Sequence, residues 1–239
     1  MNMQDLDPGL RDAVRHFWLT RQQQSTRQGE GDRDRGSRSA VTGGKQMDGF
    51  IRLVRQLPID SKVPESCIAV EKRIELPGWF RAEKKWDLVI VHNNELLAAV
   101  EFKSQMGPSF GNNFNNRTEE ALGSATDIWA AYREGAFKPS SRPFLGYLML
   151  LEDCDRSRAP VKTLSPHFPV FPEFIGASYR DRYAILIEKL LRDRLYDGAC
   201  FLLSDAASAT TGNYAQPHSE LTFAKFIAPL MARVASICA

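Results

Sequence analysis

The stretch "KWDLVIVHNNELLAAVEFKSQ", residues 85–105, consists of two apolar runs joined by the pair Asn93-Asn94. Short runs of branched apolar residues on either side of such a turn pair predict a β-hairpin. We place its strands at Trp86–His92 and Leu96–Ser104. The hairpin therefore predicts that the middle of the chain forms a sheet.

Three charged residues interrupt this apolar hairpin, namely Asp87, Glu101 and Lys103. Side chains alternate along a strand, so Glu101 and Lys103 share one surface while Phe102 points into the core. A regular two-residue turn would pair Asp87 with Val100 and face it away from Glu101. We therefore predict an odd-length loop or a β-bulge, which would place Asp87 on the face of Glu101.

The chemistry of this trio points to a metal. Two converging carboxylates repel each other unless a cation lies between them, and Mg²⁺ prefers such oxygen ligands, including a backbone carbonyl like that of Phe102. Asp87 and Glu101 would hold the ion, and Lys103 would position the water that attacks a phosphodiester. Taken alone, the spacing also fits solvated charges at the ends of strands.

Two further acids are candidates for an additional metal ligand or for support behind the ligands. Glu71 lies on the strand predicted before the hairpin, and Asp48 lies on the helix before that strand.

Composition limits the class of protein. A chain of 239 residues with 43% hydrophobic and 25% charged residues suits one globular domain and excludes disorder or a coiled coil. The net charge of +2 means that attraction to nucleic acid has to come from a local patch or a metal. The acidic start and the short longest apolar run, Phe144–Leu151, predict a cytoplasmic protein without a membrane segment. Reduced structural thiols are expected at the four scattered cysteines, Cys67, Cys154, Cys200 and Cys238.

Periodicity outside the hairpin predicts a mixed α/β domain over residues 1–239. We expect helices at Leu10–Thr20, Met47–Leu57 (ended by Pro58), Thr118–Arg133, Tyr179–Tyr196 and Thr222–Ser236. Further strands are expected at Ser66–Leu76, Phe144–Leu151 and Ala199–Leu203.

A polar tract at about residues 21–46 has almost nothing to bury and carries more basic than acidic side chains. It predicts either an arm over a phosphate backbone, with Lys45 as a phosphate contact, or a solvated loop.

A rival site lies just beyond the hairpin. The segment "GPSFG", residues 107–111, matches the G-x-S-x-G pattern of serine hydrolases, in which Ser109 could recruit Asp205 and His218. Pro108 beside the serine and the polar residues that follow it weaken this alternative.

The segments "FRAEKKWDLVIV", "AAVEFKSQMGPSFGNNFNNRTEEALGSA" and "SAVTGGKQMDGF" resemble the XhoI family of type II restriction endonucleases, and the likeness continues through "AYREGAF" and "LGYLMLLED". This family belongs to the PD-(D/E)xK nuclease superfamily, which implies a restriction-endonuclease-like core: a central mixed sheet flanked by helices. The resemblance carries the family's acid onto Asp87 and its E-x-K onto Glu101 and Lys103. Trp86 stands where the superfamily's name has a proline.

The resemblance also implies an activity. Such an enzyme is a bacterial homodimer that binds the palindrome CTCGAG and cuts after the first C with Mg²⁺, leaving 5′ overhangs and 5′-phosphate, 3′-hydroxyl ends. It would act beside an adenine DNA methyltransferase that protects the host. A DNA-binding protein with a silent nuclease core is a further alternative.

Side chains that can read bases follow the catalytic strand in "SQMGPSFGNNFNNR". Arg suits guanine, and Asn or Gln suits adenine, because each offers paired hydrogen-bonding groups. We expect this loop to reach the bases through Gln105, Asn112, Asn113, Asn115, Asn116 and Arg117. The same Asn and Gly residues would also suit a loop with left-handed turns and no DNA contact.

Overall fold

The computed structural model of the chain describes residues 3–29 and 45–235. Its centre is a five-stranded sheet in the order β1-β4-β5-β6-β7. The strands are β1 (Ile68–Ala69), β4 (Leu88–His92), β5 (Glu95–Gln105), β6 (Phe144–Glu152) and β7 (Gly198–Ser204). β1, β4 and β5 are antiparallel, whereas β5, β6 and β7 run parallel. A separate two-stranded hairpin joins β2 (Glu75–Pro77) to β3 (Glu83–Lys85).

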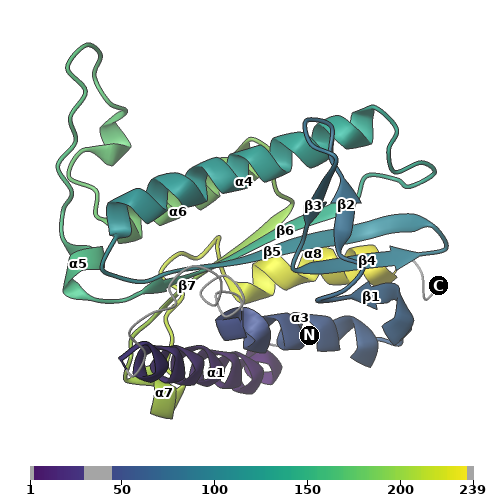
Figure 1. Cartoon of the computed structure of the whole chain (residues 1–239), viewed down its shortest axis with the longest axis horizontal. Helices are drawn as coiled ribbons and strands as arrows, with labels where there is room; N and C mark the ends of the chain where they lie inside the picture. The colour runs from purple at the N-terminus through teal and green to yellow at the C-terminus, as the bar shows by residue number, and fades with distance from the viewer. Residues whose placement is uncertain (1–2, 30–44, 236–239) are drawn as a thin grey trace.

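Helices cover both faces of the sheet (Figure 1). One face carries α4 (Phe110–Arg133) and α6 (Tyr179–Arg192), and the other carries α1 (Met3–Gly29), α3 (Asp48–Asp60) and α8 (Phe223–Ala235). Short helical turns complete the described chain: η1 (Lys45–Met47), η2 (Glu65–Cys67), α5 (Asp155–Arg158), η3 (Pro172–Phe174) and α7 (Ser208–Thr211). This arrangement confirms the predicted mixed α/β class with a central mixed sheet flanked by helices.

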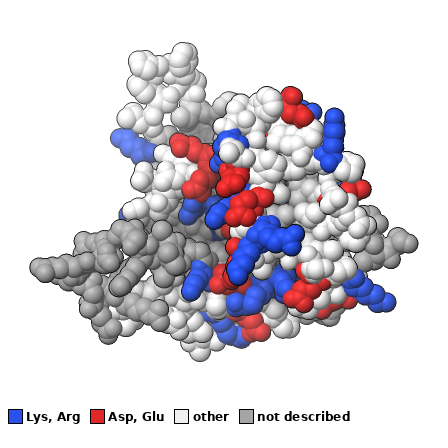
Figure 2. Space-filling view, turned by 45° about the vertical axis from the view of Figure 1, so that its right-hand side comes forward, with Lys and Arg blue, Asp and Glu red and all other residues white. Residues whose placement is uncertain are grey.

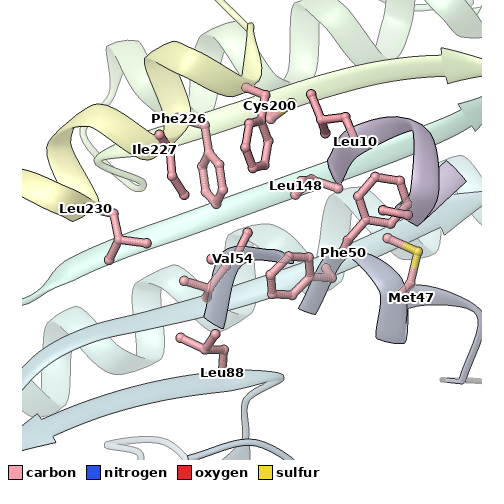
Figure 3. Close-up of a cluster of buried hydrophobic side chains, with 14 of the residues drawn as sticks. Leu10, Met47, Phe50, Val54, Leu88, Leu148, Cys200, Phe226, Ile227 and Leu230 are labelled. Carbon is pink, nitrogen blue, oxygen red and sulfur yellow. The ribbon is translucent and has the colours of Figure 1, made fainter. Parts of the chain in front are cut away.

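Two hydrophobic cores result, one on each face of the sheet. Side chains of β6 divide between them by alternation: Leu148 packs with α3 and α8, while Tyr147 and Met149 pack under α4 and α6. Figure 3 shows the first core, where Leu148 lies among Phe50, Val54, Phe226 and other side chains. Burial on both faces explains why β6 and β7 are apolar at nearly every position.

The predicted hairpin is confirmed, including its irregularity. His92 pairs with Glu95 across a two-residue turn in which Asn93 and Asn94 have φ of 48° and 63°. The register shifts between Ile90 and Val91, and one additional residue of β5 is accommodated there.

Several predicted boundaries were wrong. The first helix does not end at Thr20 but continues to Gly29, because the Gln and Arg residues of the polar tract are good helix formers that need no buried face. Pro58 lies inside the last turn of α3, which ends at Asp60. The expected helix at Thr118 begins at Phe110, and most of the predicted Asn-rich loop is therefore helical.

The predicted strand Ser66–Leu76 is also interrupted. Glu71 and Arg73 have φ of 63° and 59°, a backbone conformation incompatible with a strand, so the segment divides into β1 and β2 on different sheets. Residues 30–44 of the predicted DNA-wrapping tract lie outside the described residues. Within the described part of the chain, no helix is both long enough and apolar enough to cross a bilayer.

Candidate active site

Asp87 immediately precedes β4, and the register of β4 with β5 places it opposite Glu101. Without the bulge, the turn would pair Asp87 with Val100, but the shifted register pairs Leu88 with Val100 and brings Asp87 opposite Glu101. The backbone N–H of Asp87 donates to the carbonyl of Val100 at 3.2 Å. Its Oδ2 accepts a hydrogen bond from the N–H of Phe102 at 2.7 Å, which fixes the carboxylate against β5.

Glu101 is the most enclosed member of the site. Its Oε1 lies 2.8 Å from Nζ of Lys84 and 3.2 Å from Nζ of Lys103, and its Oε2 accepts from the hydroxyl of Tyr196 at 3.2 Å. The residue is only 2% exposed, so the expectation that it would share an open surface with Lys103 was wrong. The cause is packing of α4 and Tyr196 over this face of β5.

Lys103 connects β5 to helix α4 through an ion pair. Its Nζ lies 3.4 Å from Oε2 of Glu120, and that oxygen also accepts from Arg117 at 2.6 Å. Glu120 therefore bridges the predicted catalytic lysine and a predicted DNA-reading arginine. The face in Figure 2 shows acidic and basic side chains gathered in one band that runs down the molecule.

The two carboxylates have pKa values displaced in opposite directions. Burial raises the pKa of Asp87, and the N–H of Phe102 and the charge of Lys103 only partly offset this. Burial also opposes ionisation of Glu101, but Lys103 and Lys84 outweigh it and lower its pKa. Burial opposes the charge of Lys103 too, yet its pKa is raised because Glu101, Asp87 and Glu120 surround it. Such separated pKa values are typical of catalytic carboxylate pairs.

Lys84 and Glu120 are parts of this cluster that sequence reasoning missed. Glu120 follows Arg117 by three residues on a helix, and this spacing is a local signal for their ion pair. Lys84 had no such signal, because β3 was not predicted and its hairpin lies outside the main sheet.

The structure does not bring Asp48 and Glu71 to the Asp87–Glu101 pair. Glu71 is exposed in the turn after β1, and Asp48 begins α3, where burial raises its pKa. Glu71 is close enough to Asp48 to add to that rise. Within residues 3–29 and 45–235, no three or more Asp, Glu, His or Cys side chains converge as a metal-binding group.

The predicted base-reading residues occupy the first two turns of α4 rather than a loop. Asn112, Asn115 and Asn116 are exposed there, while Asn113 and Arg117 are half-buried. Spacing of three and four residues places the three exposed amides on one side of the helix. Lys45 is exposed in η1, which packs against α1 and α3 on the face of the sheet opposite α4.

Gln105 does not fit the predicted role of reading a base. Its side chain is buried, its Oε1 accepts from Tyr183 at 3.3 Å, and its Nε2 donates to the carbonyl of Met106 at 2.6 Å. The alternation of β5 explains this placement, because Gln105 follows Glu101 and Lys103 on the face that α6 covers.

The serine-hydrolase alternative is not supported by the geometry. Ser109 is exposed at the start of α4, whereas Asp205 accepts from Ser208 at 3.1 Å and His218 pairs with Glu188 at 2.7 Å. Among the described residues, no hydrogen bond links Ser109 to His218 or His218 to Asp205, so a triad is not assembled.

The family model and the curated relatives that match the chain all describe restriction endonucleases. The family described as "Restriction endonuclease XhoI" matches residues 24–216. The chain is 50% identical over 209 residues to the type II restriction enzyme BstVI of Geobacillus stearothermophilus, covering 85% of this chain and 93% of the relative. It is 43% identical over 194 residues to the type II restriction enzyme XhoI of Xanthomonas vasicola, covering 80% and 77%. Identity to the type II restriction enzyme AbrI of Azospirillum brasilense is 45% over 175 residues, covering 70% and 76%. No solved structure matches the chain.

Proposed function

The chain belongs to the XhoI restriction endonuclease family, and on this premise we propose that it is a type II restriction endonuclease that hydrolyses both strands of duplex DNA with Mg²⁺. The observation that carries the proposal is the bulge that sets Asp87 opposite Glu101, beside Lys103. An irregularity that aligns three charged groups on one face of an apolar hairpin is typical of a functional site.

The donor set fits the metal. Mg²⁺ is commonly held by one or two carboxylates together with several waters. Asp87 and Glu101 supply the carboxylates. The carbonyl of Phe102 is a third candidate oxygen, because its N–H already faces Asp87 and both groups of one strand residue point to the same side in an antiparallel pair.

Each residue then has a defined role. When bound, the ion would polarise the scissile phosphate and lower the pKa of a bound water. Phe102 fixes the carboxylate of Asp87 through its N–H, and Tyr196 orients Glu101 through its hydroxyl. The ammonium of Lys103 would hold the attacking water in line with the phosphorus and offset the negative charge that develops there.

The family supports a specific substrate. We propose the palindrome CTCGAG, cut after the first C to leave 5′ overhangs, read by a homodimer that presents one surface to each half-site. Asn112, Asn113, Asn115, Asn116 and Arg117 on α4 are the proposed base-reading residues. Lys45 and the tract at about residues 21–46 would contact phosphates. A cognate adenine methyltransferase would protect host DNA.

Digestion of a plasmid of known sequence tests this proposal. We expect cuts at CTCGAG sites in Mg²⁺, mapped by sequencing the fragment ends, and complete loss of cutting in EDTA. Cleavage that persists in EDTA would contradict the metal site, and cleavage at another sequence would contradict the proposed specificity. Duplex binding without any cutting in Mg²⁺ would instead support a silent nuclease core.

Replacing Lys103 by Met is expected to lower the single-turnover cleavage rate by about 100-fold, because the positioning ammonium is lost. DNA affinity, measured in Ca²⁺, should fall by less than about fivefold, since one cation near the backbone contributes little to binding. Lys225→Met is the control, because Lys225 lies on the remote helix α8 and pairs with Glu220. Its replacement should change neither the cleavage rate nor the DNA affinity. Equal losses in rate and affinity would argue against the assigned role.

A further inference from the structure

Lys84 enters the candidate active site from a separate structural unit. It lies on β3, whose partner is β2, and Lys84 pairs with Leu76 there. Figure 1 shows this hairpin rising from the sheet toward α4. The side chain is only 13% exposed, so its ammonium is held inside the site rather than in solvent.

The ammonium of Lys84 makes three close contacts in the described part of the chain, and its charge also acts on Asp87. It lies 2.8 Å from Oε1 of Glu101, donates to the carbonyl of Lys85 at 3.1 Å, and stands 4.2 Å from the centre of the Trp86 ring. Lys103 approaches the same carboxylate oxygen at the longer distance of 3.2 Å. Lys84 is thus the closer of the two cations on Glu101.

Lys84 contacts the oxygen of Glu101 that the proposed metal would bind. The other oxygen of Glu101, Oε2, already accepts from Tyr196, so Oε1 is the oxygen that faces cations. A lysine ammonium and a divalent ion on the same carboxylate oxygen repel each other, so the cation that lies closer to Oε1 opposes metal binding more strongly.

We propose that Lys84 is a positioning residue that neutralises Glu101 before the metal binds and leaves Oε1 when the metal arrives. The proposal rests on the metal site proposed above. With Lys84 in place, Asp87 and Glu101 can lie opposite each other without an ion between them. Lys84 therefore opposes metal binding in the resting protein.

Lys84 is better suited to leave than Lys103. Lys103 shares a strand and a face with Glu101 and is also held by Glu120. Lys84 has a long flexible side chain and lies on a hairpin outside the main sheet. After the ammonium leaves the carboxylate, its cation–π contact with the ring of Trp86 can still stabilise its charge.

The test measures metal binding rather than cleavage. Ca²⁺ is titrated calorimetrically into the full-length protein without DNA, comparing wild type with Lys84→Met. Because a competing charge is removed, we expect the variant to bind Ca²⁺ about tenfold more tightly. Lys84→Arg, which keeps the charge, should bind like wild type. A purely structural role for Lys84 would not tighten binding.

Lys85→Met is the matched control. Lys85 is the next residue on β3, is 72% exposed, and pairs with Glu75 at 3.5 Å, so its loss should leave the Ca²⁺ affinity within about twofold of wild type. Urea unfolding of each variant verifies that it is folded, and Lys84→Gln replaces Lys84→Met if the latter is not.

The outcomes separate the two proposals. If the wild type binds Ca²⁺ and the folded, uncharged Lys84 variant binds it equally well or more weakly, the proposed role of Lys84 is wrong. The proposed metal site is then unaffected. If neither protein binds Ca²⁺, the metal site itself fails and the role of Lys84 fails with it. Binding by the variant alone supports both.

Discussion

Replacing Glu101 by Gln is expected to reduce the cleavage rate by at least about 1000-fold, because the proposed metal loses a charged ligand at the point where transition-state charge is stabilised. The amide has nearly the shape of the carboxylate, and its oxygen can still accept from Tyr196. Single-turnover cleavage in Mg²⁺ measures the loss.

The same substitution should also affect stability. Glu101 is buried and compensates the charges of Lys84 and Lys103, so its neutralisation leaves two enclosed ammonium groups with less opposing charge. We expect the free energy of unfolding to fall by about 2 kcal/mol in urea at neutral pH.

The pH dependence of that loss has a defined sign. Burial opposes the charge of Glu101, but Lys103 and Lys84 lower its pKa below the ordinary 4.5 in the folded protein. The stabilisation is therefore fully present above the ordinary pKa and disappears as the pH falls through the folded-state value. The difference between wild type and Glu101→Gln should narrow in acid.

Glu95→Gln is the control, because Glu95 lies at the opposite end of β5 beside the turn. It should retain cleavage and stability. Undiminished cleavage by Glu101→Gln would remove the basis for assigning Glu101 as a ligand.

Asp127→Ala is expected to produce the largest loss of stability, about 3 kcal/mol, because charged hydrogen bonds to backbone donors are lost together. Asp127 is a buried acid on α4 that holds the loop between β2 and β3. Its Oδ1 accepts from the N–H groups of Trp79 and Phe80 at 2.8 and 2.7 Å, and its Oδ2 accepts from Nε of Arg81 at 2.7 Å.

This loss should extend to the active site. The loop that Asp127 holds belongs to the hairpin that carries Lys84, so loosening the loop should also loosen the position of Lys84 beside Glu101. Amide hydrogen exchange would show faster exchange at Trp79 and Phe80 and in β3. The free energy of unfolding is measured in urea.

Glu119→Ala provides the comparison on the same helix. Glu119 is exposed, and its replacement should change stability by less than about 0.5 kcal/mol. An Asp127→Ala variant as stable as Glu119→Ala would mean that the loop is held by other contacts.

Much of the candidate site could be predicted from local pattern. The turn pair Asn93-Asn94, together with the need to place Asp87 beside Glu101, required a bulge, and the structure contains it between Ile90 and Val91. Alternation along one strand placed Glu101 and Lys103 together, as their 3.2 Å separation confirms. These features depend on residues that are neighbours in the chain or across one short turn.

Other features depended on how distant elements pack. Asn112 and its neighbours were predicted as a loop because Gly and Asn favour turns, yet they form the first turns of α4, where Phe110 is buried in the core beneath the helix. Gln105 was predicted to reach DNA but is covered by Tyr183 of α6. In both cases tertiary burial outweighed local propensity.

By itself, the sequence determined the class of fold, the four longer strands of the central sheet, the catalytic candidates Asp87, Glu101 and Lys103, and the family resemblance. Only the tertiary structure decided that Glu101 is enclosed by Lys84 and Tyr196, which lie 17 and 95 residues away along the chain. The physical reason is that strand periodicity is a property of consecutive residues. Which ammonium or hydroxyl contacts a buried carboxylate depends on how a hairpin and the segment between α6 and β7 pack against the sheet, and no local pattern specifies their positions.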